Sequence, residues 1–266
     1  MVLETYPIPS EPSWRLKIAR AEHHFEDLRG AVERYRQGHH YRAVCPNPPR
    51  QPTHWRFVLE ITKPPDPQIA IVLGDVLFNI RSALDHVAVA LAPKNRKGDA
   101  GFPILDVPND ASSKPFERMT RGMPPAAVAI IDAEQPYNLT NRAPKARPDS
   151  IDALYSLSAL QNADKHRSLA VIVPGISLPT VRILWDEESL GITSPRYLDA
   201  GAELVRWSEI GNRIRYEDVR VEVSGTSHVS VNVSARDDYE LLPVAGGILG
   251  RVRDRVIPSL EPFVRT

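Results

Sequence analysis

The sequence predicts an α+β protein in which an N-terminal helical bundle with a small hairpin is followed by a C-terminal antiparallel β-meander and a final helix. Apolar residues recur at helical spacing through most of the first two thirds of the chain. From about residue 181 the apolar period changes to two, which is typical of strands with one buried face. Because helices and strands are grouped, the pattern favours α+β over alternating βαβ units. We expect a helical region at 1–175, with its hairpin at 40–61, and a β-rich region at 176–266.

The expected helices are marked by apolar residues at a spacing of three or four and by capping signals. They are Trp14–Gln37, Gln68–Ala92, Lys114–Arg121, Pro125–Ala133, a helix from Asp149 or Ser150 to about Val173, and a last helix from about Ala245. Ser13 is the expected cap of the first helix. Asp66 or Pro67 begins the second helix, and Pro93 ends it.

The expected strands combine alternation with β-branched or aromatic residues. They are His40–Cys45, His54–Ile61, Val181–Trp185, Glu203–Ile210, Tyr216–Ser224 and His228–Ser234. The first two strands form the early hairpin, joined by a proline-rich loop. The last strand alternates most cleanly, and the turn at 224–227 predicts a hairpin with its neighbour.

Composition limits the function classes. Lysine plus arginine and aspartate plus glutamate both number 33, whereas proteins that hold nucleic acid by its phosphates normally have a basic excess. A nucleic-acid role therefore needs a local patch, such as Arg142, Lys145 and Arg147, or a brief encounter with substrate. The single cysteine, Cys45, excludes an internal disulfide. The N-terminus has no signal-peptide pattern, and no apolar run approaches the roughly 20 residues that span a bilayer, so we expect a cytoplasmic protein without a membrane partner.

Motifs for common cofactors are missing from the sequence. It contains no His-Glu-x-x-His pattern, no glycine-rich dinucleotide loop, no P-loop and no nucleophile elbow. We therefore expect neither a metal nor another cofactor.

The helix expected at 68–92 has an unusual polar stripe. At 100° per residue, Asp75, Asn79, Ser82 and His86 fall within about 60° of one another, opposite the apolar face. Short polar side chains form helices less well than lysine or glutamate, which normally fill a solvated face. Three interpretations remain open: a hydrogen-bonded seam between packed helices, a ligand-facing or catalytic stripe, and plain solvent exposure.

The helix expected to end near Val173 carries a second polar group, Asn162–Arg167. By the same angular count Asp164 falls in the middle of the apolar face, where a carboxylate needs a partner. Arg81, Arg167 and His86 are its candidate partners. From both helices, we expect a ligand-binding or buried polar network comprising Asp75, Ser82, Asn162, Asp164, Lys165, His166 and Arg167.

The segment Arg81-Ser-Ala-Leu-Asp-His86 resembles the Arg-x4-His motif of HEPN (higher eukaryotes and prokaryotes nucleotide-binding) domains. These are small helical bundles found in many toxin and antiphage ribonucleases, and their motif prefers a polar residue directly after the arginine, as here. The longer sequence around this motif, residues 74–86, together with Phe102-Pro-Ile104 and 162–167, is also similar to a group of uncharacterised bacterial and phage proteins. The resemblance covers roughly residues 66–173.

This resemblance implies a metal-independent endoribonuclease of a defence or toxin system. His86 would be the general base on a ribose 2′-hydroxyl, Arg81 would hold the phosphate, and Asn79 or Asp85 would orient the imidazole. On a regular helix, however, Arg81 and His86 point about 140° apart, so one phosphate meets both only at a helix distortion or across a homodimer. The alternative is a non-catalytic module that binds a nucleotide, RNA or a protein through the same face. Whether the protein is an enzyme stays open at this point.

Overall fold

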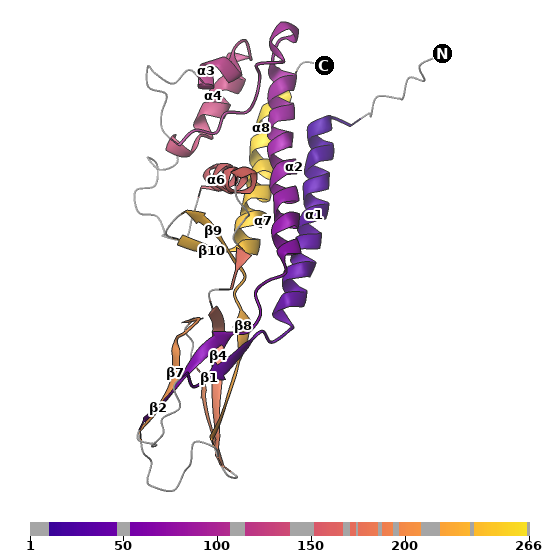
Figure 1. Cartoon of the computed structure of the whole chain (residues 1–266). Coiled ribbons are helices and arrows are strands. Elements are labelled where there is room, and N and C mark those ends of the chain that lie inside the picture. The colour runs from indigo at the N-terminus through magenta and orange to yellow at the C-terminus, as the bar shows by residue number, and fades with distance from the viewer. Residues whose placement is uncertain are drawn as a thin grey trace, which may run out of the picture.

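The computed structural model describes residues 11–46, 54–106, 115–138, 152–166, 171–173, 175–185, 188–193, 197–208, 219–234 and 237–264. Helices and antiparallel strands both occur in these ranges, so the predicted α+β class is confirmed. Figure 1 shows the helices gathered at one end of the molecule and most of the strands at the other.

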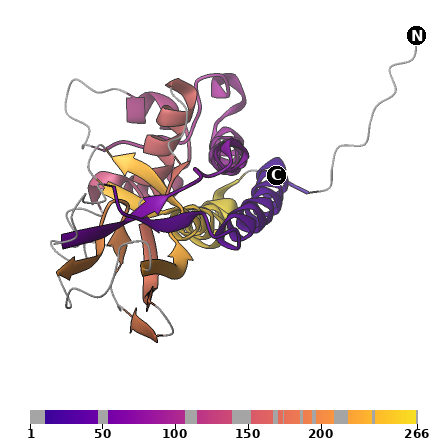
Figure 2. The same cartoon turned by 60° about the horizontal axis from the view of Figure 1, so that its bottom comes forward.

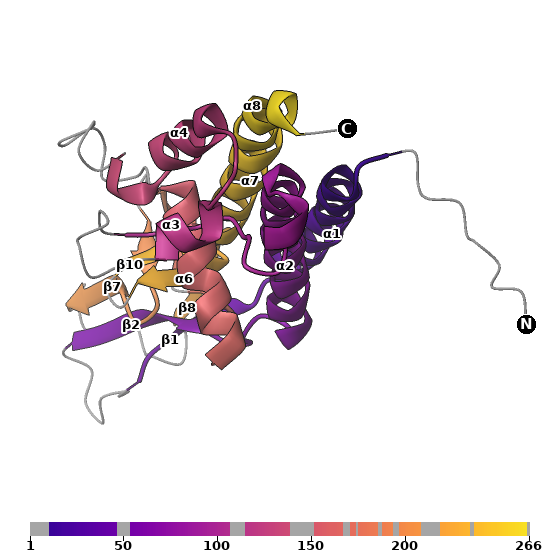
Figure 3. The same cartoon turned by 90° about the horizontal axis from the view of Figure 1, so that it is seen from above.

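The helical end is built around two long antiparallel helices, α1 and α2, which lie side by side (Figures 1 and 3). The helical segments are α1 (Ser13–Arg36), α2 (Pro67–Leu91), η1 (Lys94–Arg96), α3 (Pro115–Thr120), α4 (Pro125–Ala133), α6 (Ala153–His166), α7 (Leu241–Arg251), η4 (Val252–Val256), α8 (Ile257–Leu260) and η5 (Glu261–Phe263). The segment η4 is a turn of π-helix that joins α7 to α8. Viewed along the long helices, α1 and α6 lie on opposite sides of α2 (Figure 3).

Helix α2 follows its sequence signals closely. Asp66 caps it by accepting a hydrogen bond from the Gln68 amide at 2.9 Å, Pro67 is its first residue, and the helix ends at Leu91. Its apolar face lies in the main core. By length and composition alone α2 could cross a membrane, but half of its apolar window is buried inside the protein, which is the packing of a core helix in a soluble domain.

Helix α6 is shorter than expected. It begins at Ala153, where Asp152 accepts a hydrogen bond from the Tyr155 amide at 2.7 Å; the expected caps at 149 and 150 lie outside the described residues. It ends at His166 instead of continuing to 173. The β-branched pair at 171–172 forms a short strand instead, because it pairs with a later strand.

The strands form three antiparallel sheets, with orders β1-β2-β7, β5-β4-β6 with β8 also beside β4, and β10-β9-β3. Their bounds are β1 (Tyr41–Val44), β2 (His54–Ile61), β3 (Val171–Ile172), β4 (Gly175–Trp185), β5 (Glu188–Thr193), β6 (Leu198–Asp199), β7 (Glu203–Ser208), β8 (Val219–Ser227), β9 (Ser230–Ser234) and β10 (Asp237–Glu240). Buried residues from the first two sheets pack against each other, forming two small clusters separate from the helical core.

The division expected at residue 175 differs from the packing. Strand β2 of the early hairpin pairs with β7, with Phe57 opposite Val205, so the hairpin belongs to the β-rich end. Figure 2 shows this hairpin, in purple, among the later strands in orange. Conversely, Ala245 and Ile248 of α7 are buried in the core shared with α1 and α2. Each end of the molecule is thus made from both ends of the sequence.

The hairpin expected at 224–227 is wrong. Strand β8 continues through Ser227 and pairs with β4, and the chain then passes into another sheet. There β9 pairs with β10 and β3, and Val229, Val231 and Val233 pack into the helical core. The alternation correctly identified a strand with one buried face, but it carries no information on which strand is the partner.

Candidate functional site: a pocket between α2 and α6

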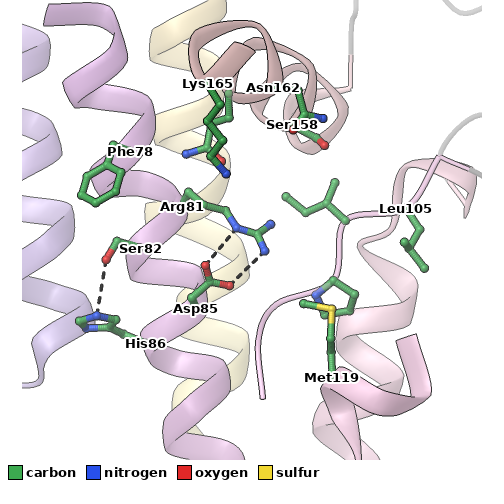
Figure 4. Close-up of a pocket in the computed structure, with 13 residues that line it drawn as sticks. Phe78, Arg81, Ser82, Asp85, His86, Leu105, Met119, Ser158, Asn162 and Lys165 are labelled. Carbon is green, nitrogen blue, oxygen red and sulfur yellow. Dashed lines mark hydrogen bonds and ion pairs between the residues drawn. The ribbon is translucent and has the colours of Figure 1, made fainter. Parts of the chain in front are cut away.

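A pocket of about 540 Å³ lies between α2, α6 and the segment that follows α2 (Figure 4). Its volume is in the range of small-molecule sites. The lining residues are Phe78, Arg81, Ser82, Asp85 and His86 of α2, Pro103, Ile104 and Leu105 of the following segment, Met119 of α3, and Ser158, Gln161, Asn162 and Lys165 of α6. The pocket therefore brings together six of the residues that the sequence singled out, from both expected polar groups.

Arg81 and Asp85 hold the segment 102–105, which forms one wall of the pocket. The guanidinium donates through Nε and Nη2 to the two carboxylate oxygens of Asp85, both at 3.1 Å, as expected for residues four apart on a helix. Nη2 also donates to the Phe102 carbonyl oxygen at 2.7 Å, and the Phe102 amide donates to Asp85 at 3.0 Å. The Arg81 side chain is 23% exposed, and among the described residues none accepts a hydrogen bond from its Nη1.

A buried glutamine, Gln135, holds the same segment, 102–105, through the backbone of that segment. Gln135, which follows α4, is fully buried. Its Nε2 donates to the carbonyl oxygens of Pro103 and Ile131, each at 2.9 Å, and its Oε1 accepts from the Leu105 amide at 3.0 Å. Sequence reasoning missed Gln135, because a glutamine at a helix end gives no local signal that distinguishes a buried position from an exposed one. The wall is thus fixed by side chains before any ligand arrives.

His86 lies toward α1, on the other edge of the pocket from Arg81. Its Nδ1 is 3.0 Å from Ser13 Oγ, and its Nε2 is 3.5 Å from Ser82 Oγ; the tautomer decides which atom donates. The expectation that Ser13 caps α1 is wrong, since Pro12 occupies the cap position and makes no side-chain cap bond. Because α2 is a regular helix, the angular separation of Arg81 and His86 persists, and within one chain they face different ends of the pocket.

The expected orienting groups of the imidazole are elsewhere. Asn79 is buried, lies outside the pocket, and donates to the backbone oxygen of Asp75 one turn earlier at 2.8 Å. Asp85 holds Arg81 and the wall, as described above. The expectation that Asn79 or Asp85 orients His86 is therefore wrong, and Asp75 is an exposed residue outside the pocket.

Helix α6 contributes a stripe of hydrogen-bonding side chains. Ser158, Gln161, Asn162 and Lys165 follow the i, i+3, i+4, i+7 spacing of one helix face. Gln161 is buried and donates to the Leu77 carbonyl oxygen at 3.2 Å, which ties α6 to α2. Asn162 and Lys165 are exposed. Ser158 and Gln161 were missed by sequence reasoning, although the angular count used on α2 would have found them.

Asp164 is exposed, so the prediction that it is buried among apolar residues is wrong. Its carboxylate lies against α2 at Gly74, 3.1–3.4 Å from the point that a Cβ of that residue would occupy. Asp164 lies in the last turn of α6, which ends at His166 and does not continue to 173 as the prediction assumed. The side chain of His166 and the whole of Arg167 lie outside the described residues.

The charge in the pocket is slightly positive. Among the described residues that line it, Arg81 and Lys165 are basic and Asp85 is the single acidic one. Among the described parts of the chain, no cluster of three or more histidine, cysteine or acidic side chains could hold a metal ion. No protein-family model, curated protein or solved structure matches the chain.

Proposed function

We propose that the pocket between α2 and α6 binds a phosphate-bearing ligand, RNA or a nucleotide. The observation that carries the proposal is that Arg81 Nη1 and the Lys165 ammonium line the same pocket and that neither has an acceptor among the described residues (Figure 4). A guanidinium held by Asp85 is already oriented, so it loses little rotamer entropy when it donates to a phosphate. Ser158 and Asn162 add neutral hydrogen-bonding groups to the same pocket.

Binding is better supported than cleavage. In cleavage by general base catalysis, the base and the phosphate-holding cation must act at one reacting centre. Arg81 and His86 instead lie at different edges of the pocket, and the imidazole is engaged by Ser13. The proposal thus makes the chain a nucleotide- or RNA-binding module of the cytoplasm.

A metal-independent endoribonuclease is the second candidate. One observation favours it: the arginine and histidine of the HEPN-like motif line the same pocket. In this candidate His86 accepts the proton of a ribose 2′-hydroxyl, and the separation from Arg81 is bridged by a longer substrate or by a second copy of the chain. A homodimer is therefore part of this candidate and not of the first.

Calorimetric titration with AMP and with adenosine tests the binding proposal, because the two ligands differ only in the phosphate. We expect AMP to bind and adenosine to bind far more weakly. Lys165→Gln should weaken AMP binding roughly tenfold, the effect of losing one charge-assisted hydrogen bond. Lys97→Gln is the matched control, since Lys97 is also an exposed lysine and lies outside the pocket. Equal affinities for AMP and adenosine, or equal effects of the two lysine variants, would contradict the proposal.

The nuclease candidate is tested separately. Wild-type protein and the His86→Ala variant are incubated with a fluorescently labelled single-stranded RNA in the presence of a chelator. Cleavage by the wild type that disappears in the variant supports the second candidate. Intact RNA in both reactions excludes the endoribonuclease, whereas the binding proposal is decided by the titrations.

A further inference from the structure

Phe78 is a large aromatic side chain that is 59% exposed and lines the pocket. Single exposed apolar residues are common on protein surfaces and need no explanation by themselves. The position of this ring is different, because it lies beside hydrogen-bonding and cationic groups in a concave site. Figure 4 shows Phe78 on the same side of α2 as Ser82 and below Lys165.

The ring lies between lysines from two different helices. On one side Lys17 of α1 places its Nζ 5.5 Å from the ring centroid, within the range of a cation–π contact. On the other side, α6 carries Lys165 at the pocket. Figure 3 shows α1 and α6 on opposite sides of α2. Lys17 and Lys165 therefore approach Phe78 from two different helices.

We infer that the ligand of this pocket is a single-stranded oligonucleotide that crosses α2, with one base stacked on the face of the Phe78 ring that Lys17 does not cover. The phosphates on either side of that base contact Lys17 at one edge and Arg81 with Lys165 at the other. This inference rests on the proposed function and specifies its ligand. Base–aromatic stacking between positively charged groups is the usual way in which proteins hold single strands without reading sequence.

The chain's charge balance agrees with a short contact of this kind. A surface that binds many phosphates normally has a strong excess of basic over acidic residues, whereas the numbers of the two are equal in this chain. Three cations, Lys17, Arg81 and Lys165, suffice for two or three phosphates. A mononucleotide would use only one of the two cationic edges, so an oligonucleotide should bind more tightly than AMP.

Fluorescence anisotropy with a labelled oligoadenylate and with an abasic oligomer of the same length tests the inference, since both carry the same phosphates and only one carries bases. We expect the oligoadenylate to bind about fivefold to a hundredfold more tightly. For about three phosphate contacts, the logarithm of the affinity should fall with the logarithm of the salt concentration with a slope of about −2. Lys17→Gln should reduce the magnitude of that slope by about 0.7.

Variants of the ring supply the second arm. Phe78→Leu keeps an apolar side chain but removes the stacking surface, so it should abolish the preference for the oligoadenylate, and Phe78→Trp should keep it. Ile71→Ala is the matched control, because Ile71 is a similarly exposed apolar residue of α2 (57%) outside the pocket.

The outcomes separate this inference from the proposed function. If both oligomers bind equally and Phe78→Leu changes nothing, stacking on Phe78 is refuted while phosphate binding stands. If neither oligomer binds and AMP does not bind either, both proposals fail. If Phe78→Leu abolishes a dimer of the wild-type protein and leaves oligonucleotide binding intact, the ring belongs to a protein interface and the inference is overturned.

Discussion

Replacing Asp85 with alanine should destabilise the protein by about 2 kcal/mol. The larger contribution comes from Phe102, a fully buried residue whose amide donates to this carboxylate and would be left without an acceptor, at a cost of about 1–3 kcal/mol. The smaller contribution is the ion pair with Arg81, whose two side chains are 23% and 38% exposed and which adds about 0.2–1 kcal/mol. Asp85 thus acts mainly by holding the pocket wall.

Two variants isolate these contributions. Asp85→Asn keeps an oxygen that can accept from the Phe102 amide and removes only the charge, so it should cost less than about 1 kcal/mol. Asp75→Ala, at an exposed position of the same helix, should lie within about 0.5 kcal/mol of the wild type.

Urea unfolding followed by circular dichroism measures the free energy of unfolding of all three variants. In thermal unfolding, the melting temperature of Asp85→Ala should fall by about 4–8 °C. Because Asp85→Asn removes a negative charge beside Arg81, it should also strengthen AMP binding about fivefold at low salt. If Asp85→Ala unfolds at the same urea concentration as Asp75→Ala, the carboxylate does not hold the wall, and the description of a preformed pocket is incorrect.

Three further predictions concern the elements around the pocket. Gln135→Leu should cost at least about 2 kcal/mol in urea unfolding, because the carbonyl oxygens of Pro103 and Ile131, both buried, and the half-buried Leu105 amide lose their hydrogen bonds. A change below about 0.5 kcal/mol would show that Gln135 does not hold the segment 103–105. Gly74→Ala should stabilise the protein by up to about 1 kcal/mol in thermal unfolding, since alanine favours the helix and the exposed Asp164 side chain can rotate away; a loss of stability would show that Asp164 is held in place. Burial raises the pKa of Asp152 above its ordinary 3.8. Between 3.8 and this raised pKa the folded protein retains a proton that the unfolded chain has released, so the free energy of unfolding falls as pH rises through that window. Asp152→Asn keeps an acceptor for the Tyr155 amide and should flatten this fall in unfolding curves taken across that pH window; an unchanged slope would assign it to other groups.

Local signals predicted the elements that proline and capping residues delimit. Strand β2 and helix α4 have the expected bounds, His54–Ile61 and Pro125–Ala133, and α2 differs by one residue at each end. The pairing of β2 with β7 and the packing of β9 on the helices were not predictable, because a period of two describes one strand and not its neighbour.

The candidate site was predicted on α2 and only in part elsewhere. The angular count identified Ser82 and His86, and residue spacing identified the Arg81–Asp85 pair. The wall at 102–105 and its anchor Gln135 come from distant parts of the chain, and only the fold brings them to α2. Burial of Asp164 was predicted wrongly because the prediction continued the apolar face of α6 to about residue 173, whereas the helix ends at His166, two residues after Asp164.

A crystal structure of the protein with bound AMP tests the central claim most directly. The phosphate should lie within hydrogen-bonding distance of Arg81 Nη1 and Lys165 Nζ, with the Arg81–Asp85 pair and the wall at 102–105 in the positions described above. A phosphate bound at another surface, with the pocket between α2 and α6 empty, would contradict the claim.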